Sequence, residues 1–168
     1  MNAYVADISS PVGAVAFATN EDGALLAARF RDSGSLEKGL SREGFTLSRD
    51  RDRTRRARRQ IVEYFAGERR SFDLPVARRG TIFQQAVWEE LSRIPFGERR
   101  AYGEVAEAIG RPGEAVEVGK ACAANHVLLV VPCHRVVGAD GSLKGYADGM
   151  RIKERLLDLE ASQKPLFA

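Results

Sequence analysis

The residues best suited to chemistry lie together in the segment 132–137, Pro-Cys-His-Arg-Val-Val. A cysteine reacts as its thiolate, and the neighbouring His134 and Arg135 would lower the pKa of Cys133. We expect this segment to follow an apolar strand at 127–131, which places Cys133 at the turn between strand and loop. Because adjacent side chains rarely face each other, His134 would act on the thiol through a water molecule or after a sharp bend. A third group, usually a carboxylate, would orient the imidazole.

The chain contains two cysteines, Cys122 and Cys133, and two histidines. Cysteines are commonly buried as small hydrophobes, so a Cys-His pair alone would favour a structural role for Cys133. Cys122 falls on the inner face of an expected helix and is interpreted as structural. With Cys133 and His134 engaged elsewhere, we expect no zinc or other metal site. Two cysteines are too few for a disulfide scaffold, which indicates a reducing, cytoplasmic location.

Patterns after residue 80 predict the helices that position this segment. Residues 81–84, Thr-Ile-Phe-Gln, form a capping-box pattern that begins one helix, and residues 95–97, Pro-Phe-Gly, end it. Two short helices at 102–109 and 113–124 are joined by a turn rich in glycine and proline, which predicts a helix-turn-helix over 102–124. A final helix is expected to follow. Its N-cap would be Asp148, and its apolar face would contain Ile152, Leu156 and Leu159.

The first part of the chain is patterned less sharply and predicts a small α/β domain. The expected elements are strands at 3–8, 13–18 and 25–30, a polar loop with some short helix at 34–52, a helix at 55–65 with an apolar stripe of Ile61, Val62 and Phe65, and a linker at 72–79. We therefore expect two domains, 1–79 and 80–168.

Composition limits the class of protein. The 168 residues are 44% hydrophobic and 29% charged, which excludes collagen, general disorder and coiled coil. No apolar run reaches the roughly 18–20 residues of a membrane span, and the N-terminus has no secretory signal pattern. We expect no membrane association.

The net charge of +3 hints at an anionic partner, but the charge is uneven. Residues 1–79 hold 15 basic and 11 acidic groups, whereas residues 80–168 hold 11 basic and 12 acidic groups. The run 49–59 contains seven arginines, which either bind phosphates or, as we favour, form a solvated face with the aspartates between them.

Residues 80–160 resemble the O6-alkylguanine-DNA alkyltransferases, also called methylated-DNA–protein-cysteine methyltransferases. The matching motifs are Gly80–Trp88, Ile94–Gly97, Ala101–Ala106, Ile109–Pro112, Ala121–Asn125, Val131–Val137, Asp140–Tyr146 and the spaced ending Lys153, Leu156, Leu157, Glu160. They follow the order and spacing of the family over about half of the chain.

The resemblance implies a ribonuclease-H-like N-terminal domain and a helical, winged-helix-like C-terminal domain. It implies direct repair of duplex DNA that contains O6-alkylguanine, with the guanine flipped out of the stack. The alkyl group would pass irreversibly to Cys133, one group per chain and without a cofactor. The second helix of the helix-turn-helix would enter the minor groove, and the protein is expected to act as a monomer.

The resemblance also implies roles for single residues. Cys133 would be the nucleophile, His134 would take its proton through a water molecule, and Glu160 would orient the imidazole. Tyr102 would donate a proton toward guanine N3, and Asn125 would fix the turn beside the cysteine. Residues matching the base pocket are Val136, Tyr146 and Ala147. The DNA-binding candidates are Tyr102, Gly103, Ala115, Val116 and Ala123. Arg111, Lys120 and Arg135 join them, because residues 80–168 carry no surplus of positive charge and a few local cations would have to bind the duplex.

The chain departs from the family on the recognition helix. The family has an arginine in an Arg-Ala-Val-Gly stretch, which fills the gap left by the extruded base, whereas residues 116–119 read Val-Glu-Val-Gly. Val116 could act as an apolar wedge, but it supplies neither charge nor hydrogen bonds to the orphaned cytosine. Glu114 and Glu117 either repel phosphates or point away from them.

Three functions are compatible with this departure. The first is a repair protein whose DNA binding is compensated elsewhere. The second is a cysteine alkyl acceptor that uses a free base or another small donor and binds duplex weakly or not at all. The third is a non-enzymatic module that binds lesions in DNA. The third is disfavoured because the family's non-enzymatic relatives lack the cysteine that is present here at position 133.

Overall fold

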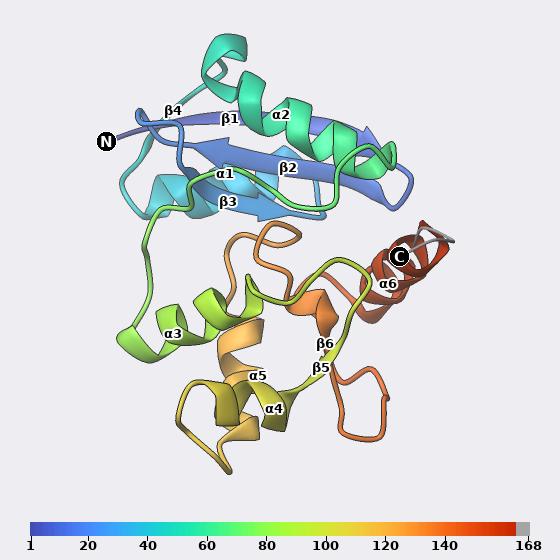
Figure 1. Ribbon diagram of the computed structural model, residues 1–168. Coiled ribbons are helices and arrows are strands. Elements are labelled where there is room, and N and C mark those ends of the chain that lie inside the picture. Colours follow the sequence, from blue (N-terminus) through green and yellow to red (C-terminus); the bar gives the residue numbers. More distant parts are fainter. Residues whose placement is uncertain (164–168) are drawn as a thin grey trace. The chain divides into compact units, whose positions relative to one another are not determined.

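The computed structural model describes residues 1–163. The chain divides into two compact units, of which the first ends at Ala77 and the second begins at Arg78 (Figure 1). This boundary lies two residues before the one expected from the sequence. Among the described residues, no helix has both the length and the apolar character needed to cross a bilayer.

The first unit contains a four-stranded sheet in the order β3-β2-β1-β4. The strands are β1 (Asn2–Ser10), β2 (Gly13–Thr19), β3 (Leu25–Arg29) and β4 (Thr46–Ser48). β1 to β3 form an antiparallel meander, and β4 returns parallel to β1. The three strands expected near residues 3–30 are confirmed.

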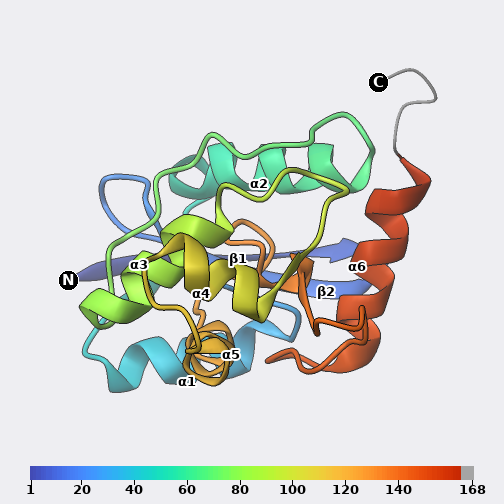
Figure 2. The same ribbon diagram turned by 60° about the horizontal axis from the view of Figure 1, so that its bottom comes forward.

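Two helices cover this sheet. Figure 2 shows α2 (Arg51–Phe65) on one face of the sheet and α1 (Ser33–Arg42) on the other. α1 packs its two buried leucines, Leu36 and Leu40, against Val5, Leu26 and alanines of the strands. The short helix expected within the loop at 34–52 is present, but the stretch is more regular than expected. A ten-residue helix, strand β4 and the start of α2 occupy this stretch, in which only two apolar residues mark the buried face of α1.

Helix α2 begins four residues earlier than expected because Asp50 caps it, accepting hydrogen bonds from the backbone of residues 52 and 53. The expected apolar stripe is wrong at Val62, whose side chain is 48% exposed. The buried face instead contains Ile61 and Tyr64 together with the polar Gln60. The Gln60 side chain donates to the carbonyl of Asp73 and accepts from its backbone N–H, which ties α2 to the segment that leaves this unit.

The second unit is mainly helical. Its elements are α3 (Ile82–Leu91), β5 (Arg100–Ala101), α4 (Tyr102–Ala108), α5 (Ala115–Ala123), the one-turn 3-10 helix η1 (Cys133–Arg135), β6 (Val136–Val137) and α6 (Met150–Ser162). α4 and α5 pack against each other, and α3 packs against both. The expected helices are thus present, with α5 beginning two residues later than the sequence suggested.

Two expectations for this unit are wrong. Residues 128–130 form turns and 127 makes only an isolated bridge, so 127–131 is not a strand, and the buried Leu129 has a left-handed backbone with φ of 74°. The strand β6 instead follows the cysteine. Asp148 does not cap α6, because the N-cap position is occupied by Gly149, and α6 has no side-chain cap. The buried face of α6 consists of Lys153, Leu156, Leu157 and Glu160, while Ile152 and Leu159 are only half-buried.

The capping box that begins α3 gives a test of local stability. The Thr81 hydroxyl accepts from the backbone N–H of Gln84, and the Gln84 side chain accepts from the backbone N–H of Thr81. We expect Thr81→Ala to lower the free energy of unfolding of this unit by about 1 kcal/mol. Urea unfolding followed by the fluorescence of Trp88, the chain's one tryptophan, measures this unit. Thr81→Ser keeps the accepting oxygen and should lose less; equal losses would contradict the cap.

Candidate active site

A two-residue strand pair brings the candidate residues together. β5 and β6 run parallel, with Arg100 opposite Val136 and Ala101 opposite Val137. Tyr102 follows β5 directly, and the turn η1, which begins with Cys133, precedes β6 directly. Because the strands run parallel, the cysteine turn enters one end of this small sheet and Tyr102 leaves the other, so residues about 30 positions apart in the sequence flank the same two-residue strand pair.

Cys133 lies in a fixed and nearly closed setting. It is 3% exposed. The amide of Asn125 donates to the carbonyl of Val131 at 2.9 Å and lies 3.4 Å from the cysteine sulfur. The amide oxygen of Asn125 accepts from the backbone N–H of Val127 at 2.9 Å. Asn125 therefore holds both ends of the turn that leads to the cysteine, which is the position expected for it.

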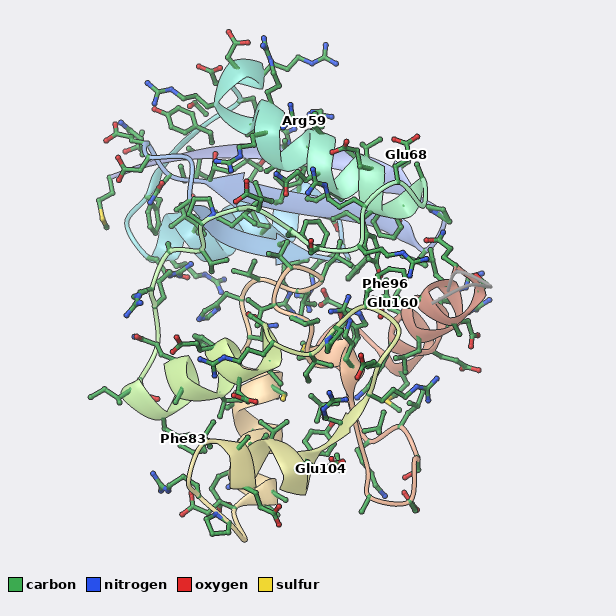
Figure 3. The ribbon with its side chains drawn as sticks, in the orientation of Figure 1. Arg59, Glu68, Phe83, Phe96, Glu104 and Glu160 are labelled. Carbon is green, nitrogen blue, oxygen red and sulfur yellow. The ribbon has the colours of Figure 1, made fainter. Side chains whose placement is uncertain are left out.

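A buried carboxylate organises the residues after the cysteine. Glu160 is 1% exposed and His134 is fully buried. The Nε2 atom of His134 lies 2.8 Å from one Glu160 oxygen, and Arg135 binds both oxygens, each at 2.9 Å. The backbone N–H of Gly97 donates to the same carboxylate at 3.2 Å. In Figure 3, Glu160 extends from α6 into the unit beside Phe96, over which the guanidinium of Arg135 lies at 5.8 Å.

This network determines which groups are charged. Burial alone would raise the pKa of Glu160, but its hydrogen bonds and the adjacent charges hold that pKa well below the usual range. Burial lowers the pKa of His134, and the hydrogen bond to Glu160 only partly opposes this. At neutral pH the imidazole is therefore neutral and the cation facing Glu160 is Arg135. Because an ionised carboxylate only accepts, Nε2 carries the hydrogen. Nδ1, which is buried without a protein hydrogen-bond partner, is then left as a proton acceptor.

A second polar contact involves a residue to which the sequence analysis gave no role. Lys153 is fully buried on α6, and its ammonium donates to the carbonyl of Gly145 at 2.9 Å and to the Tyr102 hydroxyl at 3.4 Å. Burial lowers the pKa of Lys153, which forms no ion pair among residues 1–163. Burial, and secondarily the nearby Cys122 and Cys133, raises the pKa of Tyr102 to about 12, so the phenol keeps its proton. The spacing of Lys153, Leu156 and Glu160, which puts them on one face of a helix, is the sequence signal that indicates the burial of Lys153.

Tyr102 also lines a pocket of about 370 Å³. The other lining residues are Ala115, Val116, Gly119, Lys144 and Gly145. Cys133 is not among them. The pocket is bordered by α4, α5 and the loop between β6 and α6.

The structure separates the predicted DNA-binding residues into three groups. Arg111, Val116, Lys120 and Ala123 are exposed, Tyr102, Gly103 and Ala115 are half-buried, and Arg135 is 6% exposed. The prediction that Arg135 contacts DNA is contradicted, because its buried guanidinium donates hydrogen bonds to Glu160 and to the carbonyl of Ile94, 2.7 Å away. Glu114 forms an ion pair with Arg111 at 2.9 Å, while Glu117 is exposed.

The remaining predicted residues lie around the same region. Val136 is fully buried in β6, and Tyr146 and Ala147 are half-buried in the loop that follows. Cys122 is buried on α5, and this burial raises the pKa of its thiol. Neither cysteine forms a disulfide. No cluster of three potential metal ligands occurs within residues 1–163.

Intramolecular contacts involve much of the arginine run in the first unit. Arg49 binds Asp7 and Glu37, Arg55 binds Asp52, and Arg56 binds Asp73. Arg53 donates to the carbonyl of Glu21 and lies over the ring of Tyr4. These contacts favour the interpretation of the run as a solvated, ion-paired face.

The two units and their site define an α/β domain followed by a helix-turn-helix domain that carries a buried cysteine. Residues 3–77 match the ribonuclease-like domain, and residues 82–162 the DNA binding domain, of 6-O-methylguanine DNA methyltransferase. The chain belongs to this family. It is 43% identical over 162 residues to the methylated-DNA–protein-cysteine methyltransferase of Methanosarcina acetivorans, covering 95% of this chain and 99% of that protein.

Solved structures give the same result. The O6-methylguanine methyltransferase of Mycobacterium tuberculosis superimposes with a TM-score of 0.83 at 39% identity, over 98% of this chain and 96% of that one. A structure of the M. tuberculosis protein in complex with DNA matches with a TM-score of 0.83 at 40% identity, over 97% and 96% of the two chains. The expected fold class is confirmed.

The burial of His134 predicts a pH dependence of stability. Its pKa is lower in the folded chain, so the unfolded chain binds a proton that the folded chain does not. Stability should therefore fall as the pH drops below about 6.5, by up to about 1.4 kcal/mol per pH unit. Urea unfolding from about pH 7 to about pH 5.5 measures this slope. In His134→Gln the slope should be smaller, whatever its stability at pH 7; equal slopes would contradict the assignment. Glu160 acts only at lower pH, through its depressed pKa.

Proposed function

We propose that this protein repairs DNA by transferring an alkyl group from O6 of guanine to Cys133. The observation that supports this best is the constellation around the sulfur. Cys133 is followed in the turn by a neutral His134 that Glu160 holds through Nε2, and Asn125 contacts the sulfur directly. The family of the chain and the names of its relatives agree with this chemistry.

The first step is the formation of the thiolate. Nδ1 of His134 accepts the thiol proton through a bridging water molecule, because Nε2 already carries a hydrogen bound to Glu160. The resulting imidazolium is stabilised by the ionised carboxylate of Glu160. Arg135 keeps that carboxylate ionised and in place, and therefore acts as a positioning residue.

The second step is the displacement. The cysteine sulfur attacks the saturated alkyl carbon, the carbon–O6 bond breaks, and the electron pair passes into the guanine ring. Tyr102 donates its phenolic proton to guanine N3, so that neutral guanine leaves. Lys153 contacts the Tyr102 oxygen and stabilises the negative charge that develops there. The sulfur ends as a thioether, which does not release the alkyl group, so each chain acts once and needs no cofactor.

The proposal assigns duplex DNA as the partner, with the lesion flipped out of the stack. The exposed Arg111, Val116, Lys120 and Ala123, with Tyr102, Gly103 and Ala115 beside them, form the proposed DNA surface. Val136, Tyr146 and Ala147 border the space for the base. We also propose a monomer in the cytoplasm, and the absence of a disulfide between the two cysteines fits a reducing compartment.

One alternative has a specific observation in its favour. Val116 is 67% exposed on α5, in a half of the chain that carries more acidic than basic groups. A protein that takes alkyl groups from a free base or a small donor would need no cation there. A lesion-binding module without chemistry is the weaker alternative, because Cys133 is present in a constellation suited to react.

Mass spectrometry separates these functions. After incubation with duplex DNA that contains O6-methylguanine, we expect one added methyl group on the peptide that carries Cys133. Cys122→Ser should gain the same methyl group, and Cys133→Ser should gain none. A methyl group on Cys122, or none at all, would contradict the proposal. Reaction with free O6-benzylguanine but not with duplex would establish the small-donor function. Tight binding of the lesion without a mass change would establish the binding module.

The role of Tyr102 can be tested through the leaving group. Tyr102→Phe keeps the ring but removes the proton donor, so we expect methyl transfer from duplex DNA to slow by about 10²-fold. Alkylation of Cys133 by iodoacetamide is the matched control, because iodide leaves without a proton. Its rate should be nearly unchanged in the variant. If both reactions slow equally, Tyr102 supports the structure of the site rather than the departure of guanine.

A further inference from the structure

Lys144 is an exposed cation that no step of the proposed reaction uses. It lies in the loop between β6 and α6 and lines the same pocket as Tyr102 and Val116. It forms no ion pair among residues 1–163. The nearby Asp140 accepts hydrogen bonds from the backbone N–H and the hydroxyl of Ser142, and the charge of Lys144 also helps to lower the pKa of Asp140. The ammonium of Lys144 is thus attracted to Asp140 without forming an ion pair with it, and it can meet an anionic ligand at the pocket.

The stem of Lys144 is held by a tight turn. The backbone N–H of Gly138 donates to the carbonyl of Ser142 at 2.8 Å, and that of Gly141 donates to the carbonyl of Gly138 at 2.9 Å. A Cβ atom on Gly138 would lie 2.6 Å from Cε of Lys144, so the lysine stem passes directly over this glycine. The side chain of Lys144 thus starts from a defined position rather than from an open loop.

The other side of the pocket is poor in positive charge. α5 contributes Ala115, Val116 and Gly119, of which none is charged. Arg111, just before α5, is paired with Glu114 and lies over the ring of Phe83. Lys144 is the only cation that lines this pocket in the described part of the chain.

We propose that Lys144 binds a backbone phosphate beside the extruded nucleotide, and supplies from the loop the positive charge that Val116 does not supply from α5. This inference rests on the proposed function. A phosphate is favoured over an anionic alkyl group, because the alkyl carbon must reach Cys133, which does not line the pocket. The exposed ammonium of Lys144 would instead meet a phosphate of the DNA backbone at the pocket. Phosphate contacts position a protein on DNA and release counterions, so they make binding depend on salt.

The test compares the salt dependence of binding. Lys144→Met removes the charge and keeps the stem over Gly138. Binding to duplex DNA that contains O6-methylguanine is measured in the Cys133→Ser background, which prevents transfer. The slope of log Kd against log salt should then be smaller by about 0.9 for Lys144→Met than for the parent. Lys144→Arg should keep the slope of the parent. Lys38→Met is the matched control, because Lys38 is an exposed lysine on α1 of the other unit, and its slope should also be unchanged.

A second measurement keeps this inference separate from the proposed function. Free O6-benzylguanine has no phosphate, so Lys144→Met should react with it as fast as the parent does. A slope unchanged in Lys144→Met, while the parent still repairs duplex, would overturn the role of Lys144 alone. Slower reaction with both substrates would also overturn it, since Lys144 would then act on the base or the cysteine. Absence of transfer in the parent would overturn the proposed function itself.

Discussion

The buried carboxylate of Glu160 is the interaction on which the second unit depends. Removing a carboxylate from water costs several kcal/mol unless charged and polar partners replace the solvent, and here Arg135, His134 and the backbone of Gly97 do so. These partners come from two segments, the turn η1 and the loop that contains Gly97, and Glu160 itself comes from α6, so the carboxylate is satisfied only when all three segments are in place. Meeting this one requirement also sets the position of α6, and with it Lys153, about 10 Å earlier along the same face of the helix.

Much of this arrangement could be predicted from local patterns. The cysteine segment, the helix-turn-helix and the capping box of α3 depend on residues close in sequence, whose spacing is visible directly. The three strands of the meander were predictable for the same reason. By contrast only some short helix was expected where α1 lies, because Leu36 and Leu40 alone mark its buried face among serines, glycines and charges. The order and spacing of the motifs indicated the family, and through it the pairing of His134 with Glu160.

The features that could not be predicted are those that depend on contacts between residues far apart in the sequence. The parallel pairing of β5 with β6 involves two residues on each strand, too few to leave a pattern, yet it joins the segment that leads into Tyr102 to the segment that follows the cysteine turn. Arg135 was predicted to contact DNA because residues 80–168 carry no surplus of positive charge and a few local cations would have to bind the duplex, and only the fold shows that Arg135 is bound to Glu160. For Lys153 the helical spacing indicates a buried position, but buried lysines are rare, and only the fold shows the contacts with the Tyr102 hydroxyl and the carbonyl of Gly145 that make this position possible.

The near-complete burial of Cys133 suits a protein that works as a reagent rather than as a recycling catalyst. An enzyme with many turnovers needs a path by which each product leaves its nucleophile. Here only the guanine has to depart, and it withdraws with the DNA, while the alkyl group stays on sulfur. The closed setting can therefore shield the thiol from oxidants and stray electrophiles during a long wait for a rare lesion. The number of lesions that can be repaired then equals the number of molecules with an intact thiol, so the lifetime of the free thiol matters more than the rate at which product leaves.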